Sequence, residues 1–339
     1  MRCLLLGYGY MGRIRYQVLR QHPHVKEILI VDPGIDPSTL DPAVPLWPKE
    51  RPIPWDRIDA VFVCTPNNIT AELCVEGLRR CGRVFCEKPP GRNWEEFSEI
   101  AQAAEEKPGR ILAFGLNHRL HPAIQAAKAM VGSGGLGDIL YIKGTYGKSG
   151  GLRYRENWRN NQEISGGGIL LDQGIHMLDL FCYFLGPLRV ADAVLVDSFW
   201  RCNVEDNAFV LLQSAQGTPV FLHSSATLWK HTFRLEIGCK NGYLAASGLL
   251  SKTGSYGREQ LVIGRRQFED EACALGNPRE EIIQFDRDES WEKEVHEFLE
   301  AVMENRPARY GTLEAARNVM AVIRDVYGLQ RQEISERKN

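Results

Sequence analysis

The stretch CLLLGYGYMG, residues 3–12, decides the fold of the first part of the chain. Its apolar half is typical of a buried strand, and its glycines precede a helical pattern that continues to about Gln21. A second apolar run, Ile28–Val31, ends at Asp32, about twenty residues beyond the last glycine. Strand, glycine-rich turn, helix, strand and acidic residue, in that order, predict a dinucleotide-binding βαβ unit.

Each glycine of this motif has a physical reason. We expect Gly7 to allow the tight turn, Gly9 to let the backbone approach a pyrophosphate, and Gly12 to let the helix pack closely on the strand. The N–H groups and the dipole at the start of the helix would hold the phosphates. A glycine turn without a ligand is the alternative interpretation.

Asp32 predicts which dinucleotide is bound. Its carboxylate can accept hydrogen bonds from the hydroxyls of the adenosine ribose, and it would repel a phosphate at that place. The residues that follow it are Pro33 and Gly34 rather than an arginine. NAD is therefore the expected cofactor, in preference to NADP.

Strands and helices continue to alternate as far as residue 115. Strands are expected at 60–64, 84–86 and 111–115, and helices at 70–81 and 94–106. Residues 33–54 hold seven prolines and predict a long rigid loop in place of a helix. This order indicates a doubly wound parallel sheet, whose ligands bind beyond the carboxyl ends of the strands. The segments VFVCTPNN (61–68) and VFCEKPPG (84–91) place their polar residues at that edge.

From about residue 120 the pattern becomes rich in β-strands. Strands are expected at 139–146, 193–199, 209–214, 220–227, 233–237 and 261–263, and helices at 122–131, 291–304 and 312–330. Asn241-Gly242 is a strong hairpin signal. Short connections between strands predict an antiparallel or mixed sheet. We therefore expect two domains, residues 1–118 and residues 119–339.

The composition is that of an ordinary globular protein. A net charge of −2 with 25% charged residues argues against nucleic acid or a membrane surface as a partner. The N-terminal apolar run is too short for a secretory signal, and we expect no membrane span. Nine cysteines without metal-type spacing predict reduced thiols in the cytoplasm and no metal site, with Cys64, Cys86 and Cys182 in the core.

A glycine-rich element, SGGGILLDQGIHMLDLFCYFLG, occupies residues 165–186. On a regular helix Asp172 and His176 are four residues apart and share a face, with Asp179 three residues further on. A carboxylate and an imidazole on one face suit proton transfer. The alternative interpretation is a buried helix whose polar residues have structural partners.

The segment KSGGLRYRENWR, residues 148–159, leads into this element. Its arginines suit phosphates and carboxylates, and its aromatic faces suit sugars or bases. We expect Arg153, Tyr154, Trp158 and Arg159 to contact the substrate, which would then be anionic, such as a nucleotide sugar or a sugar acid. A solvated basic loop is the alternative.

Together these elements resemble the Gfo/Idh/MocA family (glucose-fructose oxidoreductase, inositol 2-dehydrogenase and rhizopine catabolism). The motifs GYGYMG, CTPNN, CEKPPG, GLNHRLHP and GGGILLDQGIH occur in the family's order. The resemblance implies an N-terminal Rossmann domain and a C-terminal α/β domain that binds substrate. The second domain would have an open, predominantly antiparallel sheet on which homodimers or homotetramers form. Two places depart from the family: Thr70 stands where a histidine is frequent, and the family often has an arginine-type residue near His118.

The resemblance also implies the chemistry. Family members transfer a hydride between NAD(P) and a secondary hydroxyl of a sugar, nucleotide sugar or cyclitol. By analogy Lys88, preceding a cis proline, would bind the substrate hydroxyl, Asp172 would bind substrate or relay a proton, and His176 would be the general acid/base. The expected cofactor-binding residues are Gly7, Gly9, Tyr10, Met11, Gly12, Asp32, Thr65, Pro66, Asn67, Glu87, Lys88 and Asn117. Glu87 would pair with Lys88 or bind a cofactor ribose.

Two other functions remain open at this point. Some relatives are glycosidases that retain NAD and oxidise the sugar only transiently. A sensor or binding protein without turnover is disfavoured, because Lys88, Asp172 and His176 are all present. The sequence does not identify the sugar.

Overall fold

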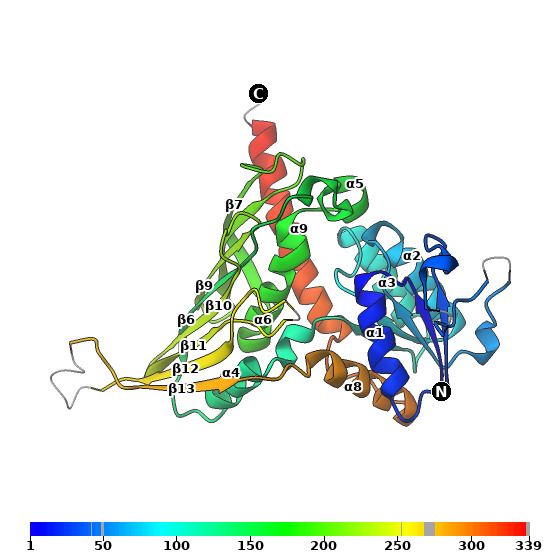
Figure 1. Ribbon diagram of the computed structural model, residues 1–339. Helices are drawn as coiled ribbons and strands as arrows, with labels where there is room; N and C mark the ends of the chain where they lie inside the picture. Colours follow the sequence, from blue (N-terminus) through cyan, green and yellow to red (C-terminus); the bar gives the residue numbers. More distant parts are fainter. Residues whose placement is uncertain (42, 49–50, 252, 268–274, 337–339) are drawn as a thin grey trace. The chain divides into compact units, whose positions relative to one another are not determined.

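The computed structural model describes residues 1–41, 43–48, 51–251, 253–267 and 275–336, and side chains as far as residue 330. Within these residues the chain forms two compact units (Figure 1). The first unit comprises Met1–Asn117, Glu163–Gly166 and Trp291–Met320. The second comprises His118–Gln162, Gly167–Ser290 and Ala321–Asn339.

The first unit contains a parallel five-stranded sheet in the order β2-β1-β3-β4-β5. Its strands are β1 (Arg2–Leu6), β2 (Glu27–Val31), β3 (Ala60–Val63), β4 (Arg83–Cys86) and β5 (Ile111–Phe114). Three helices alternate with them: α1 (Tyr10–Gln21), α2 (Asn67–Arg80) and α3 (Trp94–Glu105). The strands are apolar almost throughout because both faces of the sheet are buried. The predicted doubly wound sheet is confirmed.

The connection from β2 to β3 is the predicted long loop. Its described residues form only two short 3₁₀ turns, Pro37–Thr39 and Trp55–Arg57. Leu46 makes a parallel bridge to Ile30, so part of the loop lies along the edge of β2. The prolines explain this, because they deny the backbone the N–H groups that a helix needs.

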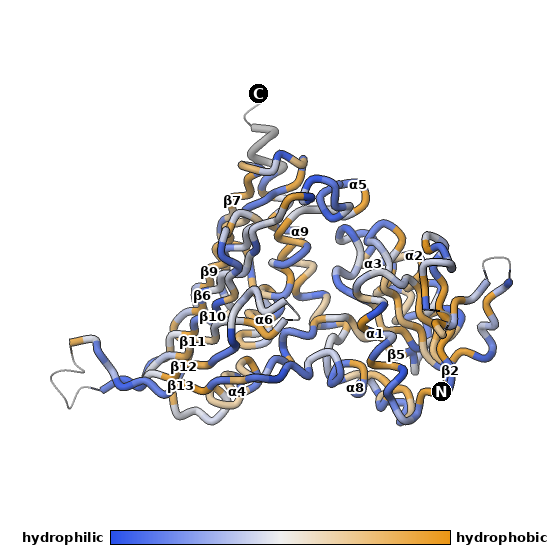
Figure 2. Tube along the Cα trace, in the orientation of Figure 1, coloured by the Kyte–Doolittle hydropathy of each residue, from blue (hydrophilic) through white to orange (hydrophobic). Residues whose placement is uncertain are grey.

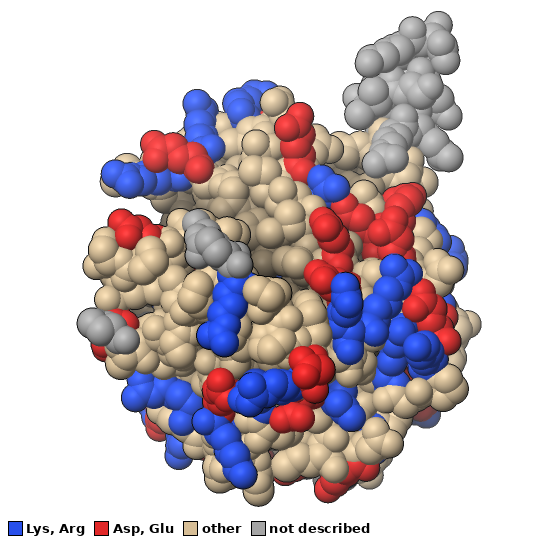
Figure 3. All heavy atoms as spheres, turned by 90° about the vertical axis from the view of Figure 1, so that its right-hand side faces the viewer, with Lys and Arg blue, Asp and Glu red and all other residues tan. Residues whose placement is uncertain are grey.

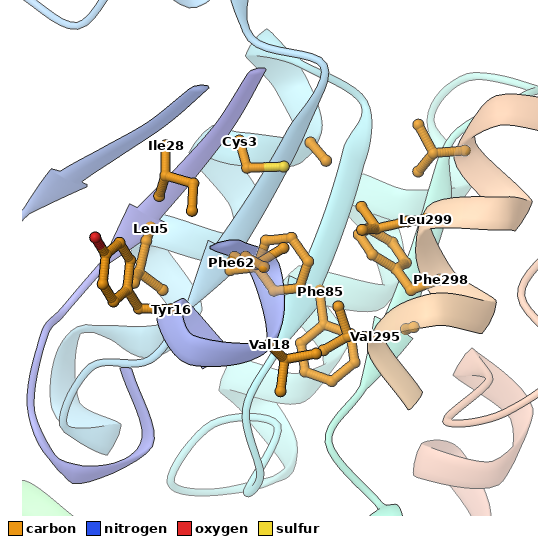
Figure 4. Close-up of a cluster of buried hydrophobic side chains, with 14 of the residues drawn as sticks. Cys3, Leu5, Tyr16, Val18, Ile28, Phe62, Phe85, Val295, Phe298 and Leu299 are labelled. Carbon is orange, nitrogen blue, oxygen red and sulfur yellow. The ribbon is translucent and has the colours of Figure 1, made fainter. Parts of the chain in front are cut away.

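The hydrophobic core of the first unit includes residues far apart in the sequence (Figure 4). Phe62 and Phe85, from β3 and β4, stack with centroids 5.4 Å apart, and Phe298 meets both rings edge-on. Phe298 lies on α8 (Ser290–Glu304), whose Val295 and Leu299 are also fully buried in this core. The predicted boundary after residue 118 assigned α8 to the second domain, whereas the structure packs this helix on the first sheet.

The second unit contains an eight-stranded sheet in the order β13-β12-β11-β10-β6-β9-β8-β7. Its strands are β6 (Ile139–Gly147), β7 (Leu188–Val196), β8 (Asn207–Ser214), β9 (Pro219–Ser225), β10 (Thr232–Cys239), β11 (Gly242–Ser247), β12 (Glu259–Arg265) and β13 (Glu280–Phe285). All pairs are antiparallel except β6 with β9, which confirms the open, mostly antiparallel sheet. Asn241-Gly242 joins β10 to β11 as the hairpin signal predicted.

Helices complete the second unit. They are α4 (Pro122–Gly132) and α6 (Ile175–Leu185), while α5 (Gln162–Ser165) and the long α9 (Leu313–Glu336) have residues in both units. The helical stretch Gln162–Leu185 is apolar and long enough to span a membrane by composition, but 78% of its most apolar window is buried. In Figure 2 the chain around α6 is coloured as strongly hydrophobic, which is expected for a helix buried in the core.

Acidic and basic side chains are interspersed over the surface that faces the viewer in Figure 3. This mixed pattern agrees with the net charge of −2.

Candidate functional site

The glycine-rich turn has the geometry that a dinucleotide requires. Gly7 has a φ of +89°, and a Cβ atom there would lie 2.5 Å from the carbonyl oxygen of Cys64. A Cβ atom at Gly12 would lie 2.2 Å from the backbone oxygen of Gly7. The helix and the strand can approach closely only because neither Gly7 nor Gly12 has a Cβ atom. At Gly9, the N-cap of α1, a Cβ atom would meet nothing within 4 Å. The turn therefore leaves open space at a helix N-terminus, which fits a phosphate.

Asp32 lies beside this turn at the end of β2. Its Oδ2 accepts a hydrogen bond from the backbone N–H of Tyr8 at 2.7 Å, and its Oδ1 accepts one from Gly34 at 2.9 Å. The carboxylate is thus fixed next to the glycine-rich turn, where an adenosine ribose would lie. The residues present fit a bound NAD.

The turn after β3 is held by hydroxyl groups. Thr70 Oγ1 donates to the backbone oxygen of Pro66 at 3.0 Å and lies 3.1 Å from Thr65 Oγ1. Asn67 is buried, and its Nδ2 donates to the backbone oxygen of Ser165 at 2.8 Å. Thr70 in place of histidine therefore shapes the turn that carries three of the predicted cofactor residues.

Glu87, at the end of β4, has a partner that the sequence did not indicate. Arg15 of α1 donates from Nε to Glu87 Oε1 at 2.6 Å and from Nη2 to Glu294 Oε2 at 2.6 Å. All three side chains are at least nine-tenths buried. Burial opposes the charge of Arg15, but the two carboxylates outweigh it and raise the pKa of the guanidinium. Glu87 therefore pairs with Arg15, where we had expected Lys88 or a ribose.

Removing the charge of Arg15 should destabilise the protein strongly. Arg15→Met would remove the guanidinium that pairs with the buried carboxylates of Glu87 and Glu294, and breaking such a pair costs about 3–5 kcal/mol. Urea unfolding measures the loss. Arg20→Met on the exposed side of the same helix is the control and should change the free energy of unfolding little. Equal stability of the two variants would contradict this account.

Lys88 follows Glu87 in the first unit. The Lys88–Pro89 peptide bond is cis, as expected from the family resemblance. The lysine is partly buried, and Gly91 closes the turn with a φ of +99° and a hydrogen bond from its N–H to the Pro89 oxygen. Asn117, the last predicted cofactor residue, is buried just after β5.

The glycine-rich element of the second unit differs from the predicted regular helix. Residues Leu170–Gly174 form one turn of π-helix, and α6 begins directly after it. A π turn contains one more residue than an α-helical turn. Residues 172, 176 and 179 therefore do not share a face as they would on a regular α-helix. Such turns are frequent at functional sites.

Asp172 lies within the π turn and faces two cations. Lys148 Nζ donates to its Oδ2 at 2.8 Å, and Arg159 Nε forms an ion pair with its Oδ1 at 3.4 Å. The carboxylate is mostly buried, with 16% of the side chain exposed. Both cations come from the basic segment 148–159, so the structure brings this predicted segment to the predicted carboxylate.

His176 is buried and stacks on a second imidazole. Its ring centroid lies 3.8 Å from that of His118, with 21° between the planes. His118 Nε2 lies 3.2 Å from the hydroxyl of Tyr146 in a buried hydrogen bond. Burial, Tyr256 and Asp172 raise the pKa of Tyr146 well above its ordinary value, so this phenol stays protonated. The stacked ring and its tyrosine were not expected from the sequence.

Asp179 has a structural role. Arg119 donates to both of its oxygens, from Nε at 2.8 Å and from Nη2 at 2.6 Å, and the carboxylate is fully buried. Of the three polar residues in the element, this one follows the alternative interpretation of a buried residue with a structural partner.

The three glycines allow close packing. A Cβ atom added at Gly167 would lie 2.2 Å from the hydroxyl oxygen of Tyr327. One added at Gly168 would lie 2.1 Å from the backbone oxygen of Glu205. Glu205 accepts hydrogen bonds from the N–H groups of Gly168 and Leu170 at 3.0 Å, and from Tyr327 at 2.9 Å. Burial raises the pKa of Glu205 while these donors lower it, and the net shift is upward. This carboxylate fixes the start of the helix that carries Asp172 and His176.

The other predicted substrate residues lie in different environments. Tyr154 is buried and packs on Trp200 with centroids 4.6 Å apart. Trp158 is partly exposed beneath the Arg159 guanidinium, 4.5 Å from the ring centroid. Arg153 points outward, with 89% of its side chain exposed and Glu156 at 3.9 Å. Arg153 therefore lies apart from the Asp172 cluster.

Among the described residues no group of three or more His, Cys, Asp or Glu side chains is arranged to hold a metal ion. The eight cysteines in the described part of the chain are free thiols. The sequence analysis did not indicate Arg15 or Glu205, and it included His118 and the segment that carries Lys148 without indicating their partners, Tyr146 and Asp172. One signal was available: Arg15 occupies the apolar face of α1, where a charge needs a buried partner.

Comparisons with known proteins agree with this arrangement. Residues 1–115 match the family "Oxidoreductase family, NAD-binding Rossmann fold", and residues 124–245 match the "GFO/IDH/MocA C-terminal domain". The chain is 25% identical over 319 residues to the uncharacterized oxidoreductase YrbE of Bacillus subtilis, covering 89% of this chain and 86% of that protein.

Two further proteins are similar to this chain. D-glucoside 3-dehydrogenase of Escherichia coli is 31% identical over 191 residues, which cover 53% of each protein. The structure of levoglucosan dehydrogenase in complex with NADH has a TM-score of 0.81 at 19% identity, covering 98% of this chain and 97% of that chain. The fold, the cofactor turn and both family matches agree: the chain belongs to the Gfo/Idh/MocA family and is an NAD(P)-dependent oxidoreductase.

Proposed function

We propose that the protein oxidises a secondary hydroxyl of a sugar or cyclitol, with the first unit binding the cofactor and the second unit the substrate. The observation that carries the proposal is the Asp172–His176 element of the second unit. It offers a fixed carboxylate and a buried imidazole on one π turn and its following helix. The names of two similar proteins, a glucoside dehydrogenase and a levoglucosan dehydrogenase, support a carbohydrate substrate.

Lys88, His176 and Asp172 each have a separate role in the proposed reaction. Lys88 holds the substrate oxygen and stabilises the negative charge that develops on it. His176 accepts the hydroxyl proton, and Asp172 accepts a hydrogen bond from a neighbouring substrate hydroxyl. Bound NAD supplies the hydride acceptor.

The proposed cofactor is NAD, because Asp32 lies where a ribose phosphate would otherwise bind. Asp32→Ala should narrow the preference for NAD over NADP, since it removes both the ribose acceptor and the repulsion of the phosphate. The ratio of kcat/KM for the two cofactors measures the preference. Asp36→Ala is a matched control, because Asp36 also caps a nearby turn, accepting from the Ser38 N–H at 2.9 Å. Wild-type protein that uses NADP as well as NAD would contradict this choice.

We also propose a homodimer or homotetramer formed on the outer face of the eight-stranded sheet. Apolar side chains lie exposed there on neighbouring strands, with Leu211 of β8 opposite Phe221 of β9 and Phe209 of β8 opposite Val194 of β7. Exposed apolar patches of this kind mark contact surfaces between proteins.

A substrate screen tests the proposed function. Free sugars, glycosides, nucleotide sugars and inositols are each incubated with the protein and NAD, and NADH is measured by absorbance. At least one class should give NADH in a saturable manner. No NADH from any class, with a folded protein that binds NAD, would overturn the proposal.

A further inference from the structure

The two cations at Asp172 approach it from opposite ends of one segment. Lys148 directly follows β6, where its backbone N–H donates to the Ser225 oxygen at 2.9 Å. Arg159 lies eleven residues later in a 3₁₀ turn, Trp158–Asn160, and its backbone N–H donates to Asn157 Oδ1 at 3.1 Å. Each contacts a different oxygen of Asp172, so the carboxylate is held on both sides.

Both cations are themselves restrained. The Arg159 guanidinium lies over the Trp158 ring at 4.5 Å, which limits its movement and favours its charge. Only 24% of the Lys148 side chain and 35% of the Arg159 side chain are exposed. A pair of restrained cations around one carboxylate fixes that carboxylate in position far better than two exposed side chains would.

The tyrosines around the cluster add no competing charge. Burial is the main cause that raises the pKa of both Tyr146 and Tyr154, and the Asp172 carboxylate raises each further. Both phenols therefore stay neutral near pH 7. Asp172 is therefore the anion that lies next to Lys148 and Arg159.

We propose that Lys148 and Arg159 are positioning residues that hold Asp172 toward the substrate, rather than a binding site for an anionic group of the substrate. The inference rests on the proposed function, in which Asp172 accepts a hydrogen bond from a sugar hydroxyl. The inference also specifies the substrate class. The basic segment already has Asp172 as its anion, so the substrate needs no negative charge and an uncharged sugar can bind.

A matched pair of substrates tests this. The pair is a neutral hexoside that the enzyme oxidises and the uronoside of the same ring configuration. Arg159→Ala should lower kcat/KM by the same factor, about tenfold, for both sugars, because the loss acts through Asp172. The Kd for NAD, measured by fluorescence without sugar, should not change. Arg159→Lys should restore part of the activity, and Arg155→Ala, at an exposed arginine of the same segment, should match wild type.

A double-mutant cycle gives the sharpest result. If Arg159 acts only through Asp172, then in an Asp172→Asn background the further change Arg159→Ala should have almost no effect on kcat/KM. If Arg159 binds the substrate itself, the two losses multiply, and the inference is wrong. A loss confined to the uronoside would overturn it as well. Wild-type protein that oxidises neither sugar nor any other carbohydrate would instead contradict the proposed function.

Discussion

Lys88→Met is expected to lower kcat/KM for the sugar by about 10²–10³-fold, the usual loss when one donor to a developing oxyanion is removed. Methionine is unbranched, keeps most of the length of the side chain and removes its charge, so the effect reports mainly the ammonium group rather than packing. The affinity for NAD should remain close to that of wild type, because the glycine-rich turn and Asp32 hold the other end of the cofactor.

Steady-state kinetics with the sugar and a fluorescence titration with NAD separate the two effects. Lys107→Met, at an exposed position of the same unit, is the control and should retain full activity. Near-wild-type turnover of Lys88→Met on the true substrate would show that Glu87 and Lys88 are ordinary turn residues. The proposed role of Lys88 would then be wrong.

His176→Ala is expected to lower kcat by about 10²–10⁴-fold, the range for loss of a general acid/base. The stacked His118 is hydrogen-bonded through Nε2 to Tyr146. The KM for NAD should change little. Added imidazole should restore part of the rate, since it can enter the space left by the side chain.

The variant His24→Ala is the control for this experiment, because His24 is exposed on the first unit. The kcat at saturating sugar and NAD is the quantity to compare. A His176→Ala enzyme within a few-fold of wild type would assign His176 a packing role against His118 only, and the proton acceptor would have to be another group.

The parallel sheet was predictable because local sequence patterns repeat there in a fixed order. Cys3–Leu6, Val61–Val63 and Val84–Cys86 are short apolar runs separated by helical periods, and buried parallel strands have this appearance. The glycine-rich turn was equally local. The position of α8 was not predictable in this way, since Phe298 joins a core whose other rings, Phe62 and Phe85, lie more than two hundred residues earlier.

The partners of charged groups were the hardest part of the site to predict. Arg15 and Glu294 are separated by 279 residues, and only the folded chain shows that they pair around Glu87. The π turn at Leu170–Gly174 has no periodic signal, because one extra residue in a single turn leaves the apolar pattern almost unchanged. Sequence reasoning therefore singled out Asp172, His176 and the basic segment 148–159, but not the individual contacts that Asp172 makes with Lys148 and Arg159.

The central claim is that this enzyme moves a hydride from a sugar carbon to the nicotinamide, and an isotope experiment tests it most directly. The oxidised sugar found in the screen is prepared with deuterium on its ring carbons and incubated with NAD and wild-type protein. Mass spectrometry should find one deuterium in each NADH, with an equal amount of keto sugar. Release of an aglycone with the cofactor unchanged would indicate the NAD-retaining glycosidase reaction, and NADH without deuterium would contradict the account.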